Sequence, residues 1–321
     1  MEPETIFELA SRNDVGLRWA NPEQLRAAYQ FESLSAFLDL YFEACTVLRT
    51  RRDFADATRA YLRRARQDGV VHAEIFFGPQ TFLDRDIPIA EMMEGILSAL
   101  QEWEGPDFSA GLLISVHRHR TEAAAFDVLR AIEPWSERVA GIGMGGAEIG
   151  NPPSKFAAFF QACREAGFPT MVHAGEEGPP AYVREALDVL RVSRIDHGVA
   201  AANDPELVAE LAARGIPLTA CPLSNLRLQV VGKLADHPLA QLLRAGIKVT
   251  VNSDDPPYFG GWVTENLVAC YEQAGLTMAE VIRIVRNGFE AAIMHEDRRA
   301  AALRRLNEYA RAQTRPRAVR E

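Results

Sequence analysis

Polar side chains of the kinds used in hydrolytic chemistry follow four apolar segments in the second half of the sequence. The four stretches read His-Ala-Gly-Glu at 173–176, Asp-His-Gly at 196–198, Cys-Pro-Leu-Ser-Asn at 221–225 and Ser-Asp-Asp-Pro at 253–256. Each has an ordinary structural explanation, because a lone histidine is usually structural, Asp before Pro usually caps a helix and Ser-Asn usually makes a turn. Those explanations would have to hold four times independently, so we interpret the stretches as parts of one site.

The residue types in these stretches suit hydrolysis assisted by a metal ion. His173 and Asp254 offer an imidazole and a carboxylate, both of which bind Zn²⁺ in proteins. Glu176, three residues after the histidine, can face the same pocket and donate or accept a proton. A second imidazole, at His197, can orient a metal-bound hydroxide. The set predicts hydrolytic attack on an electrophilic carbon.

Short β-rich apolar segments predict the frame that would hold these residues. They are near-continuously apolar, as parallel strands are when helices cover one face and a packed interior covers the other. The predicted strands span residues 70–77, 111–116, 139–144, 169–173, 194–197, 216–221 and 247–252. The last four lead into the polar stretches, and in a βα barrel the carboxyl ends of all strands open on one rim, where active sites lie. We therefore expect the four stretches to converge there.

Helical patterns occupy the rest of the chain. Residues 1–68 read as helices with no strand among them, and the spacing Thr277 to Glu280 predicts a capping box ahead of another helix. Gly246 is placed to end the helix that precedes the last strand. Residues 298–321 predict a terminal helix whose end frays. With no linker or low-complexity tract, we expect a single domain over 1–321 with a C-terminal helical tail.

Composition and charge exclude several classes of protein. A hydrophobic content of 48% over 321 residues is typical of a globular protein with a sizeable core. The net charge of −9 argues against nucleic acid or an anionic membrane as partner, and favours a small molecule. No apolar run reaches membrane-spanning length and the first residues do not resemble a signal peptide, so we expect a cytoplasmic protein. The cysteines form no Cys-x-x-Cys pair and should be reduced core residues; they are Cys45, Cys163, Cys221 and Cys270.

In this order and spacing, the four stretches resemble the adenosine/adenine deaminase family of metal-dependent (β/α)₈ hydrolases. The resemblance covers residues 2 to 290 or so, and implies a purine substrate and one Zn²⁺ per chain. It implies that His173 and Asp254 are zinc ligands, and that Asp254 also takes a proton from the zinc-bound water. It further implies that Glu176 protonates purine N1 and that His197 holds the hydroxide.

The same resemblance extends to substrate contacts and to the branch of the family. It assigns Asp255 to N7 of the purine and the backbone of Gly146 to N3. Asp196 stands where the adenosine-specific branch usually has glycine, and residues 150–156 and 260–262 also resemble the adenine deaminase branch. The implied reaction is adenine to hypoxanthine and ammonia, with adenosine or another 6-aminopurine nucleoside as the alternative substrate. Asp196 either accepts a hydrogen bond from an unsubstituted purine or forms a salt bridge with Arg194.

The sequence departs from the family pattern at its beginning. The family draws two further zinc ligands from a His-x-His on a first strand, which precedes the helix resembling residues 2–13, and this sequence begins at that helix. We therefore expect seven strands, two zinc ligands and little bound zinc. Two explanations stay open: a deaminase whose start is missing or misassigned, or a short, non-catalytic purine-binding protein. The sequence does not indicate an oligomeric state.

The remaining histidines are not expected to take part in the chemistry. His117-Arg118-His119 is a His-x-His motif, but it ends a strand where the family carries an Arg-His pair, so we do not expect it to bind metal. His72-Ala73-Glu74 matches half of the cytidine deaminase signature, whose Pro-Cys-x-x-Cys partner is absent from the sequence. His237 and His295 are predicted to be surface residues.

Overall fold

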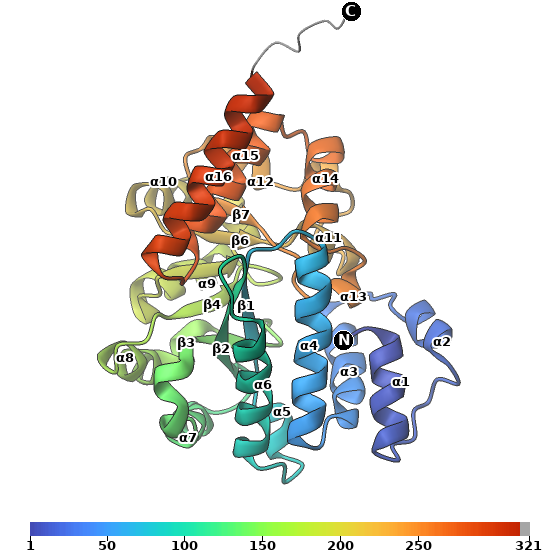
Figure 1. Ribbon diagram of the computed structural model, residues 1–321. Coiled ribbons are helices and arrows are strands. Elements are labelled where there is room, and N and C mark those ends of the chain that lie inside the picture. Colours follow the sequence, from blue (N-terminus) through green and yellow to red (C-terminus); the bar gives the residue numbers. More distant parts are fainter. Residues whose placement is uncertain (315–321) are drawn as a thin grey trace, which may run out of the picture.

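Seven parallel strands surrounded by helices form the centre of the computed structural model, which describes residues 1–314 (Figure 1). All seven predicted strands are present, with ends that differ slightly from those expected. They are β1 (His72–Phe77), β2 (Ser109–His117), β3 (Val139–Gly145), β4 (Met171–Ala174), β5 (Arg194–His197), β6 (Leu218–Ala220) and β7 (Val249–Val251).

The strands pair in the order in which they occur in the chain. One sheet has the order β1-β2-β3 and the other β4-β5-β6-β7, and a parallel bridge between Ile142 and Thr170 joins the two. Every pairing is parallel, as βα repeats produce. No pairing joins β1 to β7 among residues 1–314. The result is a TIM-type barrel that is open between β1 and β7, in agreement with the seven strands predicted.

The helices confirm the predicted alternation. Four of them precede β1, namely α1 (Pro3–Arg12), α2 (Pro22–Ala27), α3 (Leu34–Ala44) and α4 (Arg51–Gln67). Between the strands lie α5 (Gln80–Leu83), α6 (Ile89–Trp103), α7 (Glu122–Ala131), α8 (Ala157–Glu165), α9 (Pro180–Glu185), α10 (Pro205–Arg214), α11 (Pro222–Arg227) and α12 (Leu239–Arg244). After β7 come α13 (Pro256–Phe259), α14 (Val263–Gln273), α15 (Met278–Ala291) and α16 (Glu296–Thr314).

Local sequence signals act as expected at several helix ends. Thr277 caps α15 in a reciprocal capping box, since its backbone N–H donates to Glu280 and its hydroxyl accepts from the Glu280 backbone N–H. Gly246, with φ of +97°, follows α12 in the left-handed region that glycine adopts most easily. The terminal helix is α16, and the predicted fraying of residues 315–321 lies outside the described residues.

Apolar side chains from the strands and the surrounding helices form one contiguous core. All four cysteines are buried and free, as predicted. Burial raises the pKa of Cys163 and of Cys270 to about 12, so both thiols stay protonated and unreactive. No helix within residues 1–314 has the length and apolarity needed to cross a membrane.

The contact between α4 and α6 depends on a glycine. A Cβ on Gly95 would collide with the backbone oxygen of Arg51 and would lie 2.9 Å from Cβ of Phe54. Helix α6 can therefore approach α4 this closely only without a side chain at position 95.

We expect Gly95→Ala to lower the free energy of unfolding by about 1–3 kcal/mol, the usual cost of overpacking. Gly288→Ala is the matched control, because Gly288 also lies inside a helix and nothing stands within 4 Å of its added Cβ. That variant should match the wild type or gain up to about 1 kcal/mol from helix propensity. Urea unfolding measures both, and equal stabilities for the two variants would contradict the packing argument.

Candidate active site

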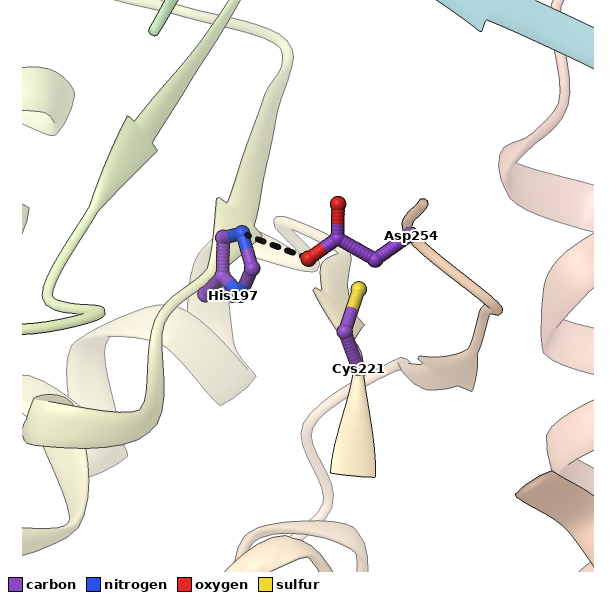
Figure 2. Close-up of side chains that lie close together, drawn as sticks. All are labelled: His197, Cys221 and Asp254. Atoms are coloured by element: carbon purple, nitrogen blue, oxygen red, sulfur yellow. Dashed lines mark ion pairs between the residues drawn. The ribbon is translucent and has the colours of Figure 1, made fainter. Parts of the chain in front are cut away.

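The carboxyl ends of β4 to β7 bring the predicted side chains together at one rim of the barrel. One ligand atom each from His197, Cys221 and Asp254 lies within 4.8 Å of the others, and Figure 2 shows these side chains facing one another. The ring of His173 lies 5.1 Å from the ring of His197, centroid to centroid. Each of the four sequence motifs thus supplies one side chain to this cluster, so the expected convergence occurs.

Two members of the cluster have an unusual backbone. His197 and Asp254 have φ of +62° and +56°, in the left-handed region that non-glycine residues rarely adopt. Such a conformation costs about 1–3 kcal/mol and persists only where surrounding structure enforces it, most often at functional sites. The strain lies where the two strands end, and it turns both side chains toward the shared space.

Glu176 is a buried acid next to this cluster. Its Oε2 atom lies 3.6 Å from Nε2 of His197, and that nitrogen lies 3.9 Å from Oδ2 of Asp254, the contact dashed in Figure 2. Burial, followed by the charge of Asp254, raises the pKa of Glu176 well above its usual range. The raised pKa favours the protonated form of Glu176, from which it can deliver a proton as a general acid.

Asp255 is a second acid in a similar state. It lines a cavity of about 590 Å³ that also reaches His173, His197 and Asp254. Burial, followed by Asp254, raises the pKa of Asp255 to about 7. A carboxyl group with that pKa can donate a hydrogen bond as well as accept one.

Asp196 has protein partners on both carboxylate oxygens. Its Oδ2 lies 3.3 Å from Nδ1 of His173, and its Oδ1 accepts a 2.9 Å hydrogen bond from the hydroxyl of Thr219 and lies 3.5 Å from Nε of Arg194. Burial alone would raise its pKa, but His173 and Arg194 outweigh burial and lower it to about 2. Of the two roles left open, the salt bridge to Arg194 is present, and a contact with the substrate stays a prediction.

The donor set suits a zinc ion in its chemistry. The side chains of His173 and Asp254 are 24% and 19% exposed, and both line the cavity. A carboxylate beside Nδ1 of His173 is the usual arrangement for a zinc-binding imidazole, since it leaves Nε2 for the metal. Burial, followed by Asp254 and Glu176, raises the pKa of the Cys221 thiol well above its usual range, which makes that group a poor ligand.

The number of ligands is smaller than usual. Within residues 1–314, His173 and Asp254 are the two ligands that the family resemblance assigns, whereas catalytic zinc usually has three or more from the protein. The cavity they line continues to β1 and β7, where the barrel is open. The residues present therefore fit one side of a zinc site.

Gly146 lies outside the cavity that the other predicted substrate-binding residues line. It follows β3 with φ of +94°, and neither it nor Glu176 lines the cavity that holds the other site residues. A Cβ at this position would stand 3.5 Å from Nδ1 of His119. Its backbone contact with N3 of a purine stays a prediction.

The sequence interpretation gave Glu148 no role, although the residue holds the loop that carries Glu176. Its buried carboxylate accepts hydrogen bonds of 2.6, 3.0, 2.8 and 2.8 Å from the consecutive backbone N–H groups of residues 175–178. Arg118, also fully buried, places a guanidinium nitrogen 3.8 Å from it. The only signal in the sequence is an acid two residues after Gly146.

The other histidines divide between structural and exposed positions. His72 shares a 2.7 Å hydrogen bond with the hydroxyl of Ser109, in keeping with a structural role. The ring of His117 stacks on that of His119 at 5.3 Å, and burial lowers the pKa of His117 to about 4.

The surface prediction was right for His295 and wrong for His237. The side chain of His295 is 74% exposed, but His237 is only 4% exposed. His237 is buried because it lies two residues before α12, whose first turn packs into the core, so that its ring lies between the backbone N–H of Leu239 and the side chain of Asn225.

Comparison with known proteins agrees with this geometry. A family profile described as adenosine deaminase matches residues 1–309. The chain is 58% identical over 310 residues to an adenine deaminase of Rhodopseudomonas palustris (strain BisB18), which covers 96% of this chain and 90% of that protein. It is 45% identical over 313 residues to an adenine deaminase of Caulobacter vibrioides (strain NA1000 / CB15N), covering 97% and 91%.

Solved structures show the same similarity. The adenine deaminase of Arthrobacter aurescens superposes with a TM-score of 0.94 at 43% identity, covering 97% of this chain and 95% of that chain. A zinc-bound amidohydrolase of Burkholderia ambifaria superposes with a TM-score of 0.88 at 26% identity, covering 97% and 88%.

We expect Glu148→Gln to lower the free energy of unfolding by about 3 kcal/mol, because it leaves buried N–H groups poorly paired and Arg118 without its counter-charge. Amide exchange in residues 175–178 should accelerate, since these N–H groups lose their acceptor. Glu133→Gln, a change of the same type at an exposed position, should alter neither. Denaturant unfolding and hydrogen exchange by mass spectrometry provide the measurements, and unchanged exchange in that loop would refute the anchoring role.

Proposed function

The chain belongs to the adenosine deaminase family, and we propose that it catalyses the hydrolytic deamination of adenine to hypoxanthine and ammonia. The observation that carries the proposal is a buried acid with a raised pKa beside an imidazole and a carboxylate: Glu176, His197 and Asp254, with contacts of 3.6 and 3.9 Å. Adenine is favoured as substrate because the relatives compared above carry the name adenine deaminase.

In this proposal His173 and Asp254 would hold a zinc ion. When bound, it supplies a water molecule activated for attack at neutral pH. Asp196 fixes the orientation of the His173 ring through Nδ1, at 3.3 Å. The same carboxylate is in turn held by Arg194, which is paired with Glu74 at 2.6 Å.

The protein side chains manage the protons of the reaction. Glu176 delivers its proton to N1 of the purine as water adds to C6, which neutralises the negative charge that develops on N1. Asp255, whose pKa is about 7, donates a hydrogen bond to N7, and the backbone of Gly146 contacts N3. Asp254 takes the proton that the water gives up on attack and passes it to N6. Collapse of the tetrahedral carbon then breaks the C6–N6 bond, ammonia leaves, and the proton of the C6 hydroxyl returns to Glu176, so that adenine and water become hypoxanthine and ammonia.

The tests below distinguish this function from two alternatives. Adenosine or another 6-aminopurine nucleoside is the alternative substrate within the family. A non-catalytic purine-binding protein is the alternative of another class, and the presence of only two assigned metal ligands in residues 1–314 favours it. A cytoplasmic location and a small-molecule partner remain parts of this proposal.

We expect Glu176→Gln to lower kcat for adenine by about two orders of magnitude or more, with a smaller effect on KM, because the amide cannot supply the N1 proton. Glu206→Gln, at a side chain that is 93% exposed, is the control and should be silent. Ammonia release is the measurement. A Glu176→Gln variant that releases ammonia from adenine at the wild-type rate would refute the role of Glu176 as general acid.

We expect kcat/KM for adenine to exceed that for adenosine, because a site fitted to the bare purine leaves a ribose without room or partners. Bound metal should be well under one equivalent per chain, given two assigned ligands, so rates are divided by the metal content of the same sample. Comparable or faster turnover of adenosine would overturn the substrate assignment. Adenine binding without any turnover per bound metal would instead favour the non-catalytic alternative.

A further inference from the structure

We infer that His237 and Asn225 are positioning residues that fix the ring proton of His197 on Nε2. A chain of hydrogen bonds runs from the backbone N–H of Leu239 through both side chains to His197, and its direction is set at the first bond. The inference deepens the proposed function, on which its catalytic consequence rests. The proton placement itself depends only on the geometry of this chain.

The first bond has a single possible direction. The backbone N–H of Leu239 points at Nδ1 of His237, at 3.1 Å, and a backbone amide can only donate. Nδ1 of His237 must therefore be the acceptor and carry no proton. Burial, followed by His197, lowers the pKa of His237 to about 4, so the neutral ring has its one proton on Nε2.

The second bond orients the amide of Asn225. Nε2 of His237 lies 3.1 Å from Oδ1 of Asn225, so the amide oxygen accepts and the amide nitrogen faces away. The reverse orientation would place an NH₂ group against an N–H donor. Asn225 is fully buried, so its side chain is shielded from solvent, and its backbone N–H and C=O are held by Cys221 and Val230 at 2.9 Å each.

The third bond transfers this direction to the site. Nδ2 of Asn225 lies 3.5 Å from Nδ1 of His197, which must accept. The ring proton of neutral His197 therefore sits on Nε2, the nitrogen that lies 3.6 Å from Glu176 and 3.9 Å from Asp254. His197 thus presents a donor to the space between the two acids.

This assignment separates His197 from the metal ligands. A nitrogen that carries a proton has no lone pair for a metal, although His197 belongs to the same close cluster as Asp254 and Cys221. The N–H instead donates to an oxygen that lies between Glu176 and Asp254, which is where the attacking water is expected. His237 and Asn225 act on the reaction only through this ring.

Substitutions at Asn225 and His237 test the placement directly. Asn225→Asp keeps the shape but replaces the NH₂ donor by a second acceptor, so a proton should move onto Nδ1 of His197. His237→Leu removes the donor that orients Asn225 and should give a mixture of tautomers. His237→Gln can still donate to Asn225 and should restore the wild-type tautomer, whereas His295→Leu at the exposed position is the control.

The readout is the ¹⁵N spectrum of the histidine rings, with His197 assigned by its loss in His197→Gln. We expect the Nε2–H tautomer for His197 in the wild type, a proton on Nδ1 in Asn225→Asp, and rescue by Gln but not Leu at 237. An Nδ1–H tautomer in the wild type, or an unchanged ring in both Asn225→Asp and His237→Leu, would overturn the inference. If Asn225→Asp does not fold, the Leu and Gln pair at position 237 decides.

Turnover then tests the consequence for the reaction. Asn225→Asp and His237→Leu should lower kcat for adenine by about tenfold or more with little change in KM, since the interaction is made in the transition state. His237→Gln should recover most of the rate. Failure of the wild type to deaminate adenine would refute the proposed function. The placement of the His197 proton would still be tested, because the ¹⁵N spectrum does not depend on turnover.

Discussion

Parallel pairing in a fixed register is the constraint on which the site depends. In the sheet, His173 is paired with Asp196, and Asp196 with Thr219. The side-chain contacts of 3.3 and 2.9 Å join the same partners, so they follow directly from the register. A slip of one residue would turn these side chains to the opposite face of the sheet and separate the imidazole from its carboxylate. Backbone hydrogen bonds thus set distances that the chemistry needs.

Neighbouring acids acquire different protonation states from their surroundings. Burial, reinforced by the charge of Asp254, raises the pKa of Glu176 well above its usual range and that of Asp255 to about 7. Asp196 is also buried, but His173 and Arg194 hold its pKa at about 2. The same functional group therefore serves as a proton carrier at one position of the site and as a fixed anion at another.

The sequence predicted those features that depend on local pattern. Apolar runs identify all seven strands, and the polar residues at their ends identify His173, Glu176, His197 and Asp254 as neighbours. Glu148 and His237 were missed because their burial depends on tertiary contacts: backbone amides nearly thirty residues away for Glu148, and the packing of α12 with the side chain of Asn225 for His237. An acid and a histidine in loops look like solvent-exposed residues until the tertiary contacts are known.

The hold of Glu148 on residues 175–178 also bears on how this barrel can be changed. Enzyme engineers often exchange the loops after individual barrel strands as if each were a separate module. Here the loop after β4 takes its shape from a carboxylate on the loop after β3. A graft of either loop alone would leave four amides or one buried carboxylate without partners. The two loops therefore behave as one structural unit, and a graft meant to change substrate specificity has to include both of them.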